Sequence, residues 1–154
     1  MPLENKGDVT SPAAQPDRSI RFGTPELVSF GLSGVTFAVG AEIAAIEQSG
    51  AVDFLTFKDF RINGIAVEVE EYRHPFSIKK GVVTSLPRPT TVFVRSTSLA
   101  KAAYKEFAES ASDWTVTGTV FVFGKFKKYG FGFKRVIPIK IDQPISNPLR
   151  PAGS

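Results

Sequence analysis

Residues 57–70 read FKDFRINGIAVEVE and contain the clearest local fold signal in the chain. Asn63 and Gly64 are the residue types that best tolerate the positive φ angles needed at both central positions of a type I′ hairpin turn. A two-residue turn here pairs Ile62 with Ile65 and places the apolar side chains of both strands on one face. The charged side chains of the other face are Asp59, Arg61, Glu68 and Glu70. This pattern predicts an antiparallel sheet with one buried and one hydrated face.

Strand-like periodicity continues on both sides of this hairpin. The expected strands lie near residues 26–32, 35–39, 75–78, 91–96, 115–123 and 131–141. Residues 98–111 repeat apolar and small side chains at three- and four-residue spacing, which predicts a helix. The fold class expected is all-β to α+β: an antiparallel β-sandwich of about seven strands with one helix near residues 98–111.

The chain has 154 residues, which matches one domain. Residues 1–24 combine prolines, glycines and few large apolar side chains, so we expect a flexible N-terminal arm there. Residues 25–149 form the expected single β-sandwich domain, and residues 150–154 a tail. Prolines beyond Asp142 predict that regular structure ends near that residue.

The composition argues against several kinds of chemistry. The chain has no Cys, which excludes disulfides, thiolate nucleophiles and Cys-ligated metals. Its one His, His74, has no recognisable nucleophile motif beside it, and the sequence holds no phosphate loop or dinucleotide fingerprint. Glu68, Glu70 and Glu71 follow the spacing of a hydrated strand face more closely than that of a cation site. We therefore expect no enzyme activity, no cofactor and no metal site.

Charge and hydropathy indicate an ordinary water-soluble domain. The net charge is +4, which many domains without a polyanionic partner also carry. No apolar run has the length of a signal peptide core or of a membrane-spanning helix. The expected location is cytoplasmic by default, or periplasmic or extracellular if a leader has been removed.

Residues 118–135 read GTVFVFGKFKKYGFGFKR and interleave basic with aromatic side chains. Cations can neutralise phosphates while aromatic rings stack on unpaired bases, so this stretch suits a single-stranded nucleic acid. The candidate binding surface consists of Lys125, Phe126, Lys127, Lys128, Tyr129, Phe131, Lys134 and Arg135. The alternative is a plain β-hairpin whose Phe side chains alternate between core and surface, joined by a solvated basic loop at residues 124–130.

Motifs along most of the chain occur in a familiar order. They are PELVS at 25–29, GVTF at 34–37, FKDFRINGIAV at 57–67, LP at 86–87, TTVFV at 90–94, WTVTGTVFV at 114–122 and RVIPI at 135–139. This order resembles the water-stress and hypersensitive-response (WHy) domain of the atypical late-embryogenesis-abundant group 2 family. The resemblance covers residues 25–149, although each motif is short.

The resemblance implies a β-sandwich like that of fibronectin type III with one helix, without cofactor or catalytic residues. It also implies a protective role in desiccation or cold, with partly unfolded client proteins or membrane surfaces as partners. Two other functions stay open. One is single-stranded nucleic-acid binding through residues 121–135, and the other is an adaptor or envelope interaction module that uses exposed strand edges.

Overall fold

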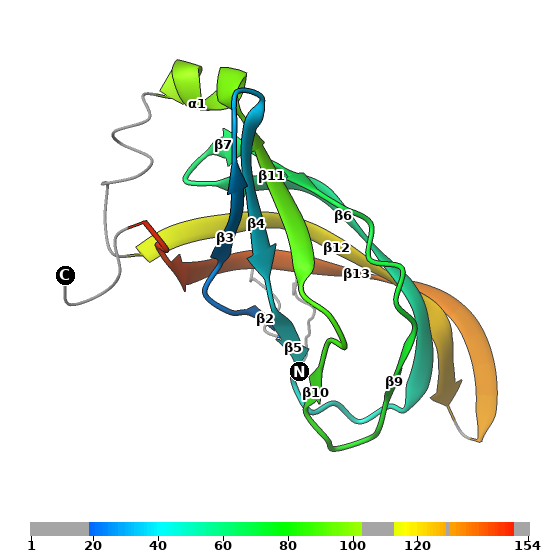
Figure 1. Ribbon diagram of the computed structural model, residues 1–154. Helices are drawn as coiled ribbons and strands as arrows, with labels where there is room; N and C mark the ends of the chain where they lie inside the picture. Colours follow the sequence, from blue (N-terminus) through cyan, green and yellow to red (C-terminus); the bar gives the residue numbers. More distant parts are fainter. Residues whose placement is uncertain (1–18, 103–112, 129, 150–154) are drawn as a thin grey trace, which may run out of the picture.

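The computed structural model describes residues 19–102, 113–128 and 130–149, with residues 100–102 and 128 described by their backbone alone. Two antiparallel sheets face each other, in the orders β3-β4-β11-β8 and β13-β12-β6-β7, and β9 also pairs with β6 (Figure 1). A small third sheet has the order β10-β5-β2. The predicted antiparallel β-sandwich is confirmed, and the described residues contain one short helix.

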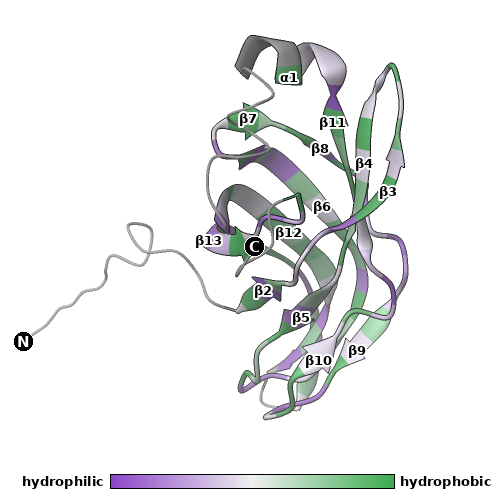
Figure 2. Cartoon of the chain, turned by 60° about the vertical axis from the view of Figure 1, so that its left-hand side comes forward, coloured by the Kyte–Doolittle hydropathy of each residue, from purple (hydrophilic) through white to green (hydrophobic). Residues whose placement is uncertain are grey.

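The elements have the following bounds. They are β2 Ile20–Phe22, β3 Glu26–Phe30, β4 Gly34–Val39, β5 Ala41–Ile43, β6 Gly50–Ile62, β7 Ile65–Ala66, β8 Glu68–Val69, β9 Phe76–Ile78, β10 Thr84–Ser85, β11 Thr90–Arg95, α1 Ser96–Ala102, β12 Asp113–Lys128 and β13 Phe131–Ser146. Figure 2 shows the sandwich from the side, with β6 and β12 in one layer and β4 and β11 in the other.

The predicted hairpin forms between β6 and β7. Ile62 pairs with Ile65, and Asn63 and Gly64 have φ angles of 52° and 80°. Both isoleucines are buried, so the apolar face of this hairpin meets the core as predicted. The turn is also tied to β12, because the Thr115 N–H donates to Asn63 Oδ1 at 2.9 Å and the Asn63 N–H donates to the Thr115 carbonyl at 2.9 Å.

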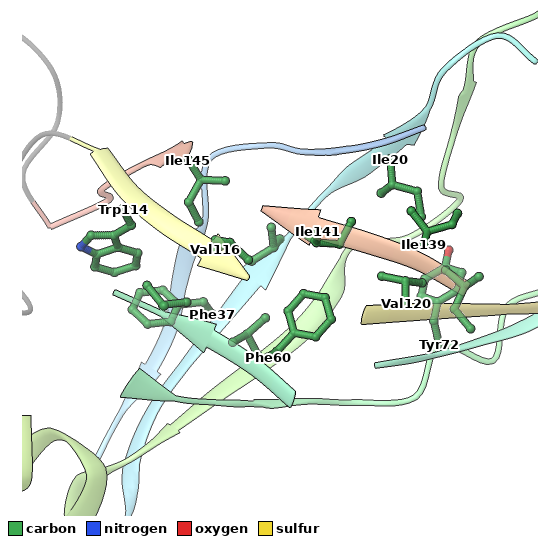
Figure 3. Packing of buried hydrophobic residues seen from close by; sticks show 14 of the residues in the cluster. Ile20, Phe37, Phe60, Tyr72, Trp114, Val116, Val120, Ile139, Ile141 and Ile145 are labelled. Atoms are coloured by element: carbon green, nitrogen blue, oxygen red, sulfur yellow. The ribbon is translucent and has the colours of Figure 1, made fainter. Parts of the chain in front are cut away.

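The core lies between the two large sheets. Trp114 and Phe37 are almost fully buried and meet edge to face, with ring centroids 5.7 Å apart. They come from opposite layers, β12 and β4, so this contact joins the two sheets (Figure 3). Burial of two large aromatic rings removes apolar surface from water, which is the main force that holds such layers together.

The two longest strands extend further than predicted. The predicted loop at residues 124–130 is wrong for residues 124–128, because these residues continue the ladder of β12 with β13. The predicted end of regular structure near Asp142 is also wrong, because β13 continues to Ser146. Pro144 fits there because β13 is an edge strand. Proline lacks a backbone N–H, and on the open side of an edge strand no hydrogen bond of the sheet needs one.

The helix begins two residues before its predicted start. It runs over Ser96–Ala102, directly after β11, and its residue Leu99 is buried in the core. Residues 103–111 of the predicted helix lie outside the described part of the chain. Residues Ile20–Phe22 form β2, and the Ile20 side chain is buried in the core cluster.

Candidate binding surfaces

The β12–β13 ribbon separates the predicted binding residues onto two faces. Lys125 pairs with Lys134, and Phe126 pairs with Phe133. Because side chains alternate along a strand, Lys125, Lys127 and Lys134 share the outer face. The other face carries Phe126, Phe131, Phe133 and Arg135, and further along β12 this face continues into the core.

Phe126 belongs to the core and not to the surface. Its side chain is 3% exposed. It packs against Gly50 of β6, where a Cβ atom would lie 2.6 Å from Phe126 Cδ1. This close approach joins the start of β6 to β12 and leaves Phe126 unavailable to a partner.

The cations of this region form no ion pair among the described residues. Lys125, Lys127, Lys134 and Arg135 are exposed, and residues 124–136 contain no Asp or Glu. Within the described residues, the ion pairs lie elsewhere, at Arg73–Glu71, Lys80–Glu47 and Arg95–Glu68. The ribbon end therefore has an uncompensated positive charge. Of the other predicted site residues, Tyr129 lies outside the described residues and Lys128 is described by its backbone alone.

Apolar side chains are exposed at the same end of the ribbon. Phe131 is 68% exposed, Phe133 is 49% exposed and Val136 is 51% exposed. On the outer face, Phe54 and Phe123 stack with ring centroids 4.3 Å apart, and Val136 pairs with Phe123 on the neighbouring strand. We name Lys125, Lys127 and residues 131–136 the ribbon tip.

A shallow groove adjoins the ribbon tip. Its volume is about 500 Å³, and it is lined by Ser49, Gly50, Ala51, Ser77, Ile78, Lys125, Lys127 and Gly132. Most of the lining residues are small, and the stem of Lys125 passes close to Gly132, where a Cβ would lie 3.2 Å from Lys125 Cε. The lining thus includes two lysines and two serines, residue types that can bind an anionic group such as a phosphate.

A second exposed surface lies on β3, where no binding residue was predicted. Every residue of β3 is exposed, and β3 is an edge strand of its sheet. Val28 and Phe30 are 62% and 71% exposed, and Leu32 in the following turn is fully exposed. We name residues 26–32 the β3 edge. Sequence periodicity marked these residues as a strand but could not show that the strand lies at the margin of the sandwich.

The one histidine has a structural environment. The His74 ring contacts Tyr72 edge to face, with centroids 5.1 Å apart, and the Tyr72 hydroxyl accepts a hydrogen bond from the Arg88 N–H at 2.8 Å. In the part of the chain that the structure describes, no three His, Asp or Glu side chains gather in a way that could hold a metal ion. Of the three glutamates weighed as a cation site, Glu68 pairs with Arg95 and Glu71 pairs with Arg73. The absence of catalysis stays a prediction.

In residues 19–102, 113–128 and 130–149, the only helix is α1 and it is too short to cross a bilayer.

Comparisons with known proteins give structural likenesses only. No family model matches the chain, and no curated protein matches it. A protein from Archaeoglobus fulgidus is 12% identical with a TM-score of 0.40, over 82% of this chain and 95% of that one. The protein AT1g01470 from Arabidopsis thaliana is 16% identical with a TM-score of 0.48, over 85% of this chain and 82% of that one. A third protein, At2g46140.1, named as a candidate late embryogenesis abundant protein, is 14% identical with a TM-score of 0.33, over 90% of this chain and 75% of that one.

Proposed function

We propose that this chain is a non-enzymatic, stress-protective binding domain of the late-embryogenesis-abundant type, and that it holds partly unfolded protein segments along the β3 edge. The observation that carries the proposal is the complete exposure of β3 at the margin of its sheet. Its apolar side chains Leu27, Val28 and Phe30 lie beside an edge whose backbone groups can accept another strand.

The chemistry of the β3 edge suits an unfolded chain. A partly unfolded protein exposes both apolar side chains and unpaired backbone N–H and C=O groups. A strand added beside β3 would pair those backbone groups and cover Val28 or Phe30 at the same time. Drying and freezing remove the water that otherwise solvates such groups, so the benefit of pairing grows under these conditions.

The β3 edge lacks most of the devices that usually protect such edges. Natural sheets block exposed edges with lysines, prolines or inward-pointing charges. Here β3 contains one charged residue, Glu26, and four apolar or small residues follow it. A backbone irregularity between Leu27 and Ser29 is the one feature that would disturb a partner strand. An apolar edge with so little protection in a folded domain favours use as a docking site over a merely structural role.

The family resemblance in the sequence supports the same function. The ordered motifs from residues 25 to 149 resemble the WHy domain, whose proteins are associated with tolerance of water loss. The first of these motifs, PELVS at 25–29, contains most of β3.

The test is survival of a freeze-labile enzyme, lactate dehydrogenase, through repeated freezing. The full chain should preserve more activity than an equal mass of ribonuclease A. Val28→Lys with Phe30→Lys should lower protection to the ribonuclease level, because lysines on an edge strand prevent strand addition. The matched control is Val82→Lys with Val83→Lys, which changes apolar residues of similar exposure outside β3 and should protect like the unchanged chain. Equal protection by both variants would overturn the proposal.

A further inference from the structure

The ribbon tip extends beyond the rest of its sheet. The last residue pair between β12 and β6 is Phe126 with Gly50. Beyond it, β12 and β13 pair with each other up to Lys128 and Phe131, apart from a hydrogen bond from the Lys127 N–H to the Ser49 carbonyl at 3.0 Å. Figure 1 shows this end of the molecule far from the turn between β3 and β4. Both faces of the ribbon are therefore accessible at its end.

Apolar and cationic side chains follow a fixed order along the ribbon. Phe131 lies nearest the turn and is the most exposed of the three apolar residues of the tip. Lys134 and Arg135 lie three and four residues further back on β13, and Lys125 pairs with Lys134. At about 3.3 Å per residue, the cations are roughly 10–13 Å behind Phe131.

We infer that the ribbon tip docks this protein onto an anionic lipid surface. Apolar groups of interfacial proteins enter the boundary between headgroups and acyl chains to a depth of about 5–10 Å. With Phe131 at that boundary, Lys134, Arg135 and Lys125 lie at the level of the lipid phosphates. The lack of acidic residues at the tip means that every cation there can contribute to attraction by an anionic surface.

The groove beside the tip completes the lipid-binding surface. Lys125 and Lys127 line it together with Ser49 and Ser77, and its volume of about 500 Å³ can admit a phosphate-bearing headgroup. Lysine ammonium and serine hydroxyl groups can donate hydrogen bonds to the phosphate and carboxylate oxygens of such a headgroup. The groove therefore adds direct headgroup contacts to the general attraction of the tip.

The geometry favours a lipid surface over a single-stranded nucleic acid. Nucleic-acid strands need aromatic rings beside phosphate-binding cations on one surface. Here the most exposed rings, Phe131 and Phe133, share their face with Arg135 alone among the cations whose side chains the structure describes, and Phe126 is buried. The rings on the face of the tip lysines, Phe54 and Phe123, stack on each other and are only partly exposed. A membrane interface surrounds a protruding ribbon and can contact both faces at once. A second copy of the chain is also disfavoured, because two cationic tips repel each other.

This inference does not depend on the proposed function, because the β3 edge lies at a different part of the sandwich. The test uses the full chain and flotation with vesicles of phosphatidylcholine containing 30% phosphatidylserine, against vesicles of phosphatidylcholine alone. Binding is expected only to the anionic vesicles and should weaken as salt is raised. Lys125→Gln with Lys134→Gln should weaken binding about 25-fold, at roughly fivefold for each lost cation. Phe131→Ser should weaken it by about tenfold or more.

The matched control is Lys140→Gln. Lys140 is exposed on the same strand, about 20 Å from Lys134, and pairs with Thr119 away from the tip. This variant should bind like the unchanged chain. A second readout is Phe131→Trp, whose emission should shift to the blue on anionic vesicles, while the buried Trp114 contributes a constant signal.

Three results would overturn the inference. They are no flotation at low salt, equal flotation with neutral vesicles, or equal weakening by Lys140→Gln and by the tip variants. If the chain instead binds a single-stranded oligonucleotide and not the vesicles, and the two Gln substitutions at Lys125 and Lys134 abolish that binding, the ribbon tip is a nucleic-acid site.

Discussion

The ring of Phe60 lies directly against the backbone of Gly118, where a Cβ atom would come within 2.5 Å of Phe60 Cδ1. Gly118 also has a φ of +154°. The contact lies where the pairing of β6 with β12 is irregular, between Thr117 and Thr119. On β6, Asp59 precedes Phe60 at this irregularity and has a positive φ of 55°. The missing side chain at residue 118 therefore lets Phe60 enter the core where the two strands change register.

Gly118→Ala should destabilise the fold because the added methyl group displaces the Phe60 ring. Overpacking of a core typically costs about 1–3 kcal/mol. Urea unfolding followed by Trp114 fluorescence measures the change. Gly40→Ala is the matched control, since no heavy atom lies within 4 Å of its added Cβ, and it should change stability by less than about 0.5 kcal/mol. Equal effects of the two substitutions would contradict the packing described for Phe60.

Asn63→Ala should lower the free energy of unfolding by about 1–2 kcal/mol. Alanine is disfavoured at the positive φ of 52°, and the hydrogen bond from the Thr115 N–H to Asn63 Oδ1 is lost. Asn63→Gly keeps the backbone conformation accessible and loses only the side-chain bond, so it should cost less. An Asn63→Gly variant that is less stable than Asn63→Ala would show that backbone strain does not decide the turn.

Phe37→Ala should cost about 3–5 kcal/mol, because it opens a cavity beside Trp114 between the two sheets. The near-ultraviolet circular dichroism of Trp114 should weaken with it. Phe30→Ala makes the same chemical change at a side chain that is 71% exposed and should stay within about 0.5 kcal/mol. A large loss of stability from Phe30→Ala would contradict the exposure of the β3 edge.

Features that depend on neighbouring residues could be predicted from the sequence. The turn at Asn63 and Gly64 follows from the φ preferences of two adjacent residues. The length of β12 could not be predicted in the same way, because residues 124–126 are held by pairs with β6 that are distant in sequence. Local glycines and lysines suggested a loop there, whereas tertiary pairing makes a strand.

The candidate surfaces also combine features that local sequence predicts with features that depend on distant contacts. Lys125 and Lys134 could be predicted as surface residues because charged side chains are seldom buried. Alternation alone could not assign Phe126 to the core, because the choice of inner face depends on its contact with Gly50. The β3 edge was missed for a related reason: a period of two identifies a strand, but the order of strands in the sheet decides which one is exposed.

Because the chain contains no Cys, one introduced cysteine can carry a photo-crosslinker at a single defined place. The most direct test of strand capture uses Phe30→Cys with such a label and reduced, carboxymethylated α-lactalbumin as a permanently unfolded client. Val83→Cys, at a residue that is 55% exposed in the loop before β10, is the control. Strand capture at the β3 edge predicts crosslinks from residue 30 and few from residue 83. Equal crosslinking from both residues, or none from residue 30, would contradict it.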